Sequence, residues 1–323
     1  MAVGILIWIC IFVAGLIVLL KSSDFFTGAA EKIGLKLGIP SFVVGVTIVA
    51  IGTSLPELIS SIFAVTNGAS EIVIGNVVGS NIANILLVLG VVAIVSKKIE
   101  THYEILKVDL PIFFASALYI LITCFDGEFN YIEGIIGLIG VIVYLIYAAS
   151  SAKKNDNKSK QKKELKGINK ELIKEGISPQ LLILLISGFF IFIGAKYTID
   201  SVIQISEMLN IGKELIAISA VAIGTSLPEL FVGYSAAKKG NAGMAFGNVL
   251  GSNIFNSFGV LGVASLFGVL TIPSSIIMFS LPVMIGASLL YFFMTQDKQL
   301  TLWEGAILLL LYVLYIGKIF TLF

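Results

Sequence analysis

The chain has 323 residues, of which 57% are hydrophobic and only 13% charged, and its formal net charge is +1. Soluble domains carry about 25% charged and about 45–50% apolar residues, so this composition excludes a single soluble domain and a disordered chain. The near-zero charge, with basic residues confined to polar segments between apolar runs, argues against a nucleic-acid binder. The chain is therefore predicted to be a polytopic membrane protein that sits in a lipid bilayer.

Ten apolar stretches are long enough to cross a bilayer, which takes about 20 helical residues each. In chain order they cover residues 3–20, 39–65, 72–95, 108–124, 131–149, 180–199, 211–237, 243–267, 273–294 and 301–321. They are apolar on all sides, whereas the strands of a membrane barrel alternate in polarity. The first stretch lacks a basic leader and a small-residue cleavage site, so it is predicted to be a retained span. The predicted fold class is all-α, with ten transmembrane helices.

Lysine supplies all 21 basic residues, and its distribution over the polar segments predicts the topology. When these segments are assigned alternately to two sides, 18 lysines fall on one side and three, Lys196, Lys213 and Lys318, on the other. Positively charged loops face the cytoplasm, so both termini are predicted to lie outside a plasma membrane. Residues 150–178 form the long polar stretch of the chain and are predicted to be a cytoplasmic linker. The alternative is a basic segment that binds anionic headgroups.

An internal repeat is the strongest pattern in the sequence. VAIGTSLPEL occurs at residues 49–58 and again at 221–230, and GNVVGSNIAN at 75–84 returns as GNVLGSNIFN at 247–256. Both pairs are 172 residues apart, and 24 of 46 positions in the surrounding ungapped alignment are identical. This similarity indicates a duplication.

The duplicated unit contains five predicted spans. It occurs as residues 1–149 and again as residues 179–323, with the linker between the two copies. Because five is odd, the second copy enters the membrane in the opposite orientation. In transporters, such inverted repeats place the substrate site near the midplane between the two copies.

Glu57 and Glu229 are the acidic residues deep within the repeated spans. A charge there costs about 2.5–3.5 kcal/mol on insertion scales, and no lysine lies in either motif to pair with it. Pro56 and Pro228 precede the two glutamates, and each proline frees backbone carbonyls about one turn earlier. Open backbone at membrane depth is tolerated where it lines a cavity or is buried in protein. The two motifs therefore predict an ion site.

Hydroxyl and amide oxygens accompany each glutamate in matched pairs. They belong to Thr53, Ser54, Ser80 and Asn84 in the first copy and to Thr225, Ser226, Ser252 and Asn256 in the second. A single serine or threonine in a membrane helix more often serves helix packing, but the duplication favours a ligand role. An all-oxygen set suits hard cations such as calcium, whereas transition metals favour His or Cys. The other asparagines of these motifs, Asn76, Asn81, Asn248 and Asn253, are interpreted as residues that pack helices or satisfy backbone carbonyls rather than as ligands.

The paired GTSLPEL and GNVxGSN blocks resemble the two alpha-repeats of the calcium/cation antiporter superfamily, specifically its sodium/calcium exchanger branch, over essentially the whole chain. The resemblance implies that Glu57 and Glu229 bind calcium together with backbone oxygens of Thr53 and Thr225. It implies a sodium-binding set made of Thr53, Ser54, Ser80, Thr225, Ser226 and Ser252 with the carbonyls of Ala50 and Ala222. Asn84 and Asn256 would complete the centre. Calcium and sodium would be transported ions, with no cofactor and no obligate protein partner.

Two departures from relatives refine this expectation. Some relatives, including potassium-dependent exchangers, have Asp where this chain has Asn256, so the site resembles that of potassium-independent exchangers. The linker is also too short for the calcium-sensing domains of animal exchangers. Members of the proton-coupled branch carry an acidic residue in the GN block, and this chain has none.

The leading hypothesis is therefore a sodium/calcium antiporter that works by alternating access. A calcium/proton antiporter is the alternative within transport. A cation channel is the alternative from another class, although channels usually build their pore from identical rings. An enzyme is disfavoured because Ser54 and Ser226 have no His or Lys partner in their motifs.

Overall fold

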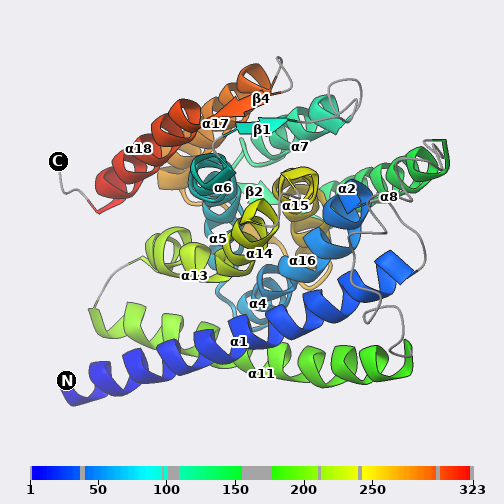
Figure 1. Ribbon diagram of the computed structural model, residues 1–323. Coiled ribbons are helices and arrows are strands. Elements are labelled where there is room, and N and C mark those ends of the chain that lie inside the picture. Colours follow the sequence, from blue (N-terminus) through cyan, green and yellow to red (C-terminus); the bar gives the residue numbers. More distant parts are fainter. Residues whose placement is uncertain are drawn as a thin grey trace.

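The computed structural model describes residues 2–36, 41–96, 98–100, 109–154, 177–209, 212–238, 242–295 and 299–320, and these are almost wholly helical (Figure 1). In the labels, η marks a π-helix. The first half contains α1 (Ala2–Lys36), α2 (Ser41–Val44), η1 (Gly45–Val49), α3 (Ala50–Thr53), α4 (Leu55–Thr66), α5 (Glu71–Ala83), η2 (Asn84–Val88), α6 (Leu89–Ser96), β1 (Lys98–Glu100), α7 (Asp109–Thr123), β2 (Glu128–Phe129) and α8 (Tyr131–Lys154). The second half contains α11 (Ile177–Leu209), α12 (Lys213–Ile216), η4 (Ala217–Val221), α13 (Ala222–Thr225), α14 (Leu227–Lys238), α15 (Ala242–Ile254), η5 (Phe255–Val260), α16 (Leu261–Ser265), β3 (Leu270–Thr271), η6 (Ile276–Ser280), α17 (Leu281–Met294), β4 (Gln299–Thr301) and α18 (Leu302–Ile319).

Seven helical stretches in the described part of the chain are long and apolar enough to cross a membrane. An eighth candidate is the bent pair formed by residues 45–53 and α4. The apolar helix α7 has only 15 residues. The predicted span 243–267 is largely helical, as α15, η5 and α16, but it is not among these candidates. The prediction of a helical membrane protein is therefore confirmed, while ten crossings remain a prediction.

The helix α1 is longer than the apolar stretch that predicted it. It continues to Lys36, so the loop expected from residue 21 onward is helical up to that residue. Likewise, α11 continues to Leu209 rather than ending near residue 199. The apolar length of a helix marks its bilayer crossing, whereas the helix itself can continue through polar residues such as Lys21 and Asp24.

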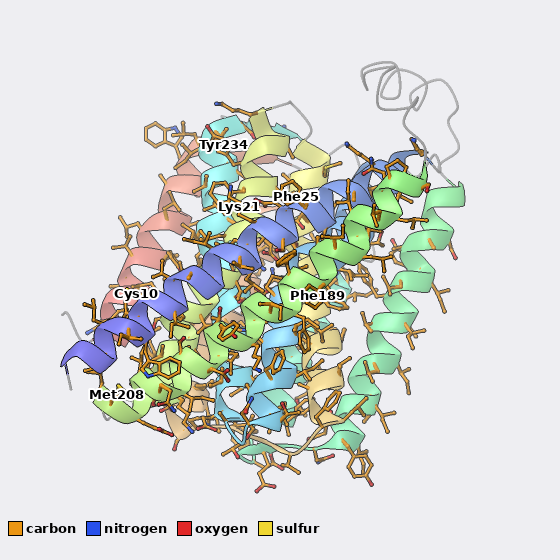
Figure 2. All side chains as sticks on the ribbon, turned by 90° about the horizontal axis from the view of Figure 1, so that it is seen from below. Cys10, Lys21, Phe25, Phe189, Met208 and Tyr234 are labelled. Carbon is orange, nitrogen blue, oxygen red and sulfur yellow. The ribbon has the colours of Figure 1, made fainter. Side chains whose placement is uncertain are left out.

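The two long helices α1 and α11 lie side by side and run antiparallel across one face of the other helices (Figures 1 and 2). They pack closely at Gly194, where a Cβ atom would lie 2.6 Å from the backbone nitrogen of Leu19. Their outward side chains are apolar; Phe25 and Phe189 are 65% and 61% exposed. Cys10 on α1 is also exposed. This face is therefore suited to lipid.

The repeated motifs form the centre of the molecule. All residues of α5 after Glu71 are buried. A Cβ atom at Gly79 would lie 2.7 Å from that of Ala222, and one at Gly251 would lie 2.7 Å from that of Ala50. Real Cβ atoms essentially never approach so closely. Glycine at these two positions therefore lets α5 and α15 approach the helices α13 and α3 of the opposite half.

Two short antiparallel ladders are the exceptions to the all-α prediction. β1 pairs with β4, and β2 pairs with β3, so each ladder joins one half of the chain to the other. Adding 172 to the β1 positions gives 270–272, which overlaps β3, and adding it to the β2 positions gives 300–301, within β4. A shift of 172 residues thus relates the strands of one ladder to the strands of the other. Strands of two or three residues are too short to produce a recognisable period-2 pattern in the sequence.

Candidate functional site

Each repeated glutamate lies just after a break in its helix. The break between α3 and α4 is at Ser54 (φ −87°, ψ 6°), and the break between α13 and α14 is at Ser226 (φ −82°, ψ 0°). In the first copy the two segments are bent by 43°. Glu57 and Glu229 therefore belong to the first turn of a new helix. The unpaired backbone N–H groups and the helix dipole favour negative charge at such a position.

Four of the π-helices occur at matching places in the two copies. η1 and η4 immediately precede the broken helices, η2 begins at Asn84, and η5 contains Asn256. Hydrogen bonds from i to i+5 are rare in proteins and frequently occur at functional sites. The sequence patterns did not predict these turns, because they change neither the apolar composition nor the helical period by enough to be recognised.

The predicted site residues are all removed from solvent. None of the twelve is more than 2% exposed; they are Ala50, Thr53, Ser54, Glu57, Ser80, Asn84, Ala222, Thr225, Ser226, Glu229, Ser252 and Asn256. They come from the two broken helices and from α5–η2 and α15–η5.

One hydrogen bond at the glutamates connects the two copies, and another lies within the first copy. Ser54 Oγ donates to Glu229 Oε1 over 3.2 Å, although the two residues are 175 positions apart. Ser80 Oγ donates to Glu57 Oε1, also over 3.2 Å. Ser54 lies three residues before Glu57, so its bond to Glu229 brings the two glutamates together. The fold therefore brings both predicted acidic ligands to one centre.

A second set of contacts obeys the repeat offset. Thr53 Oγ1 lies 3.3 Å from Ser252 Oγ, and the equivalent Ser80 Oγ lies 3.4 Å from Thr225 Oγ1. Ser252 Oγ also lies 3.5 Å from the carbonyl oxygen of Ala50, at the limit of a hydrogen bond. The hydroxyls of one half are thus placed against those of the other.

Asn76 and Asn248 have a role that the sequence interpretation missed. Thr225 Oγ1 is positioned to donate to Asn76 Oδ1 over 3.2 Å, and Thr53 Oγ1 to Asn248 Oδ1 over the same distance. These asparagines therefore orient the hydroxyls of two predicted ligands. Their equivalence under the repeat offset was the available signal. In contrast, Asn253 donates to the carbonyl of Val249 in its own helix, as a packing residue would.

Several buried polar atoms at this centre have no hydrogen-bond partner among the residues that the structure describes. They are Oε2 of Glu57, Oε2 of Glu229, Oγ of Ser226 and both amide atoms of Asn84 and of Asn256. Leaving a buried polar atom unpaired costs about 1–3 kcal/mol, and more for a charged group. Among the described residues no group of three or more His, Cys, Asp and Glu could hold a metal ion. A cation at this centre would therefore be held by two carboxylates and neutral oxygens.

Comparisons with known proteins identify similar chains over almost the full length. The family model described as "Sodium/calcium exchanger protein" matches residues 7–150 and 179–320. The sodium/calcium exchanger MaX1 of Methanosarcina acetivorans is 40% identical over 96% of this chain and 97% of its own. An uncharacterized membrane protein of Methanocaldococcus jannaschii, MJ0091, is 33% identical over 95% and 96%.

A solved structure of the sodium-calcium exchanger NCX_Mj, soaked with sodium and strontium, has a similar fold. It covers 96% of this chain and 97% of its own, with a TM-score of 0.71 and 33% sequence identity. The matches and the apolar helices agree on a multi-pass membrane protein. Its characterised relatives are exchangers, which are transporters and not enzymes.

Proposed function

Because this chain belongs to the sodium/calcium exchanger family, we propose that it is a secondary antiporter that exchanges sodium for calcium by alternating access. The observation that carries the proposal is the buried pair Glu57 and Glu229, one from each copy of the repeat, surrounded by unpaired oxygen atoms. Two carboxylates balance one divalent ion or most of the charge of several sodium ions. Calcium accepts six to eight oxygen ligands in flexible geometry, which suits this mixed set.

We assign different sets of ligands to calcium and to sodium. Calcium is bound by the carboxylates of Glu57 and Glu229 with backbone oxygens of Thr53 and Thr225. Sodium uses the wider set of Thr53, Ser54, Ser80, Thr225, Ser226 and Ser252, with the carbonyls of Ala50 and Ala222. Asn84 and Asn256 complete the centre. The burial of all these residues and the hydrogen bonds between the two halves support this assignment.

Alternating access follows from the proposed architecture of two inverted five-span repeats, 1–149 and 179–323, joined by the linker 150–178. Exchanging the conformations of two equivalent halves moves the opening of a central site from one side of the membrane to the other. The paired hydroxyl contacts, the paired glycine contacts and the two ladders all obey the same offset, which supports this arrangement. The lysine distribution supports a topology in which both termini lie outside the plasma membrane.

Calcium flux in liposomes tests the proposed function, with sodium, potassium and proton gradients imposed one at a time. A sodium gradient is expected to drive calcium flux, whereas a potassium gradient or a proton gradient alone is not expected to drive it. If several sodium ions exchange for one calcium, each net charge moved contributes about 2.3 kcal/mol per 100 mV, so a membrane potential changes the rate. Drive by protons alone would favour the calcium/proton antiporter, and calcium conductance without a counter-ion would favour a channel.

Replacing residues 153–174 with a neutral flexible segment of equal length is expected to leave exchange nearly intact. Every proposed ligand lies outside this segment, most of which falls outside the described residues. The measurement is sodium-driven calcium uptake by protein whose insertion has been verified. Loss of uptake in a correctly inserted variant would instead show that the lysines of residues 153–174 have a regulatory role.

The variant Asn256→Asp is expected to make exchange sensitive to acid pH or to potassium, whereas the natural protein needs no potassium. A third carboxylate would join Glu57 and Glu229 in a low-dielectric centre. Its charge would have to be balanced by a bound proton or by an additional monovalent cation. The measurement is sodium-driven calcium flux across a pH series, with and without potassium, in both proteins. Identical behaviour under all conditions would place Asn256 away from the ion centre.

A further inference from the structure

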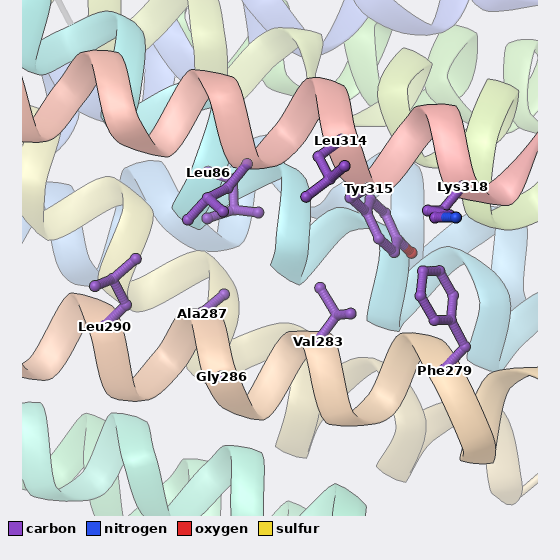
Figure 3. Close-up of a pocket in the computed structure, with 10 residues that line it drawn as sticks. Leu86, Phe279, Val283, Gly286, Ala287, Leu290, Leu314, Tyr315 and Lys318 are labelled. Atoms are coloured by element: carbon purple, nitrogen blue, oxygen red, sulfur yellow. The ribbon is translucent and has the colours of Figure 1, made fainter. Parts of the chain in front are cut away.

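A groove of about 410 Å³ lies between α17 and α18, and none of its lining residues belongs to the proposed ion site. Figure 3 shows Leu290 near one end, and Phe279, Tyr315 and Lys318 at the other. Leu86 of η2 lies between the two helices and is only 2% exposed. The lining is apolar apart from Tyr315 and Lys318; it consists of Leu86, Phe279, Val283, Gly286, Ala287, Leu290, Leu311, Leu314, Tyr315 and Lys318.

The dimensions of this groove match one leaflet of a bilayer. The eleven-residue separation between Phe279 and Leu290 corresponds to roughly 16 Å at the helical rise of about 1.5 Å per residue, and half of a hydrocarbon core is about 15 Å. Gly286 leaves the middle of the groove open, because a Cβ atom there would meet nothing within 4 Å. A single extended hydrocarbon chain therefore fits its length and polarity.

Lys318 supplies a positive charge at one end of this apolar groove. Its side chain is exposed, and in the described part of the chain it forms no ion pair, unlike Lys213, which lies 3.5 Å from Glu71. Lysines near the ends of membrane helices extend toward the interface, where the headgroups lie. The charge is thus complementary to an anionic headgroup.

We propose that the groove between α17 and α18 binds one acyl chain of a phospholipid whose anionic headgroup pairs with Lys318. The bound chain would contact Leu86 on η2, the π-helix that begins with Asn84. This lipid site is separate from the exchange reaction, so it stands or fails independently of the proposed function.

Native mass spectrometry of the full chain tests this proposal, with phosphatidylglycerol or phosphatidylcholine carrying identical acyl chains. The natural protein is expected to retain one phosphatidylglycerol with about fivefold preference over phosphatidylcholine, the effect of one lysine near a headgroup. Lys318→Gln removes the preference, and Gly286→Phe fills the groove and removes the retained lipid. Gly188→Phe on α11 is the matched control, because a Cβ atom there meets only a ring atom of Phe26, at 3.9 Å; this variant retains the lipid.

Photolabelling provides a second measurement that needs no variant. Phosphatidylglycerol with a photoreactive acyl chain is expected to label peptides containing residues 279–290 and 311–318. The proposal is overturned if the label falls elsewhere, if Gly286→Phe retains lipid as the natural protein does, or if the natural protein binds both lipids equally. A dimer that forms in place of the bound lipid would also overturn it.

Discussion

Glu57→Gln and Glu229→Gln are each expected to abolish calcium transport in a protein that still folds and inserts. Either change leaves one negative charge to balance a divalent ion in a site that is closed to water. Losing about 3 kcal/mol of binding free energy lowers the affinity for calcium by more than about 100-fold. The fold itself should tolerate the change. In the ion-free protein no cation balances the two buried carboxylates, so removing one charge relieves the repulsion between them.

Two measurements separate loss of the site from loss of the fold. The first is calcium uptake into sodium-loaded liposomes. The second is the unfolding temperature with and without calcium, because a ligand that binds the folded state raises it. Both variants are expected to keep the calcium-free unfolding temperature and to lose its increase with calcium. Near-normal uptake by either variant would contradict the assignment of that glutamate as a calcium ligand.

Glu71→Gln is the matched control for these variants. Glu71 begins α5 and pairs with Lys213 at 3.5 Å, with both side chains about one quarter exposed. Exposed ion pairs contribute about 0–1 kcal/mol. Uptake and the response to calcium are therefore expected to remain near those of the natural protein.

The acidic, hydroxyl and amide residues of the candidate site could be chosen from the sequence because each has a chemical reason to be unusual, whereas Ala50 and Ala222 came from the family resemblance. Glu57 and Glu229 are carboxylates in apolar surroundings without lysine, and such groups are retained in membranes for function. Pro56 and Pro228 predicted interrupted helices, and the structure has the breaks at Ser54 and Ser226, two residues before each proline. Burial of the whole set agrees with these predictions.

The arrangement of these residues could not be derived in the same way. The bond from Ser54 to Glu229 depends on how two distant segments pack, and the repeat would equally allow a bond from Ser226 to Glu57. In the structure Ser226 Oγ has no partner. The π-turns and the role of Asn76 and Asn248 likewise depend on the packing of the opposite half.

Gly251→Ala and Gly79→Ala are expected to lower sodium-driven calcium uptake by at least about tenfold and to destabilise the protein. Each added methyl group would lie 2.7 Å from the Cβ of Ala50 or Ala222, respectively. Overpacking of this kind costs about 1–3 kcal/mol, which exceeds the gain of about 1 kcal/mol from replacing glycine in a helix. The helices must therefore separate.

The separation moves the parts of the site that these contacts hold together. Ala50 and Ala222 carry two of the proposed carbonyl ligands, so a shift of either helix changes the coordination distances. Gly243→Ala provides the control within α15, because a Cβ atom there meets nothing within 4 Å. It should leave uptake unchanged and stabilise the protein by at most about 1 kcal/mol. If Gly251→Ala and Gly79→Ala match this control in uptake and unfolding temperature, close packing at the two glycines does not position the ion site.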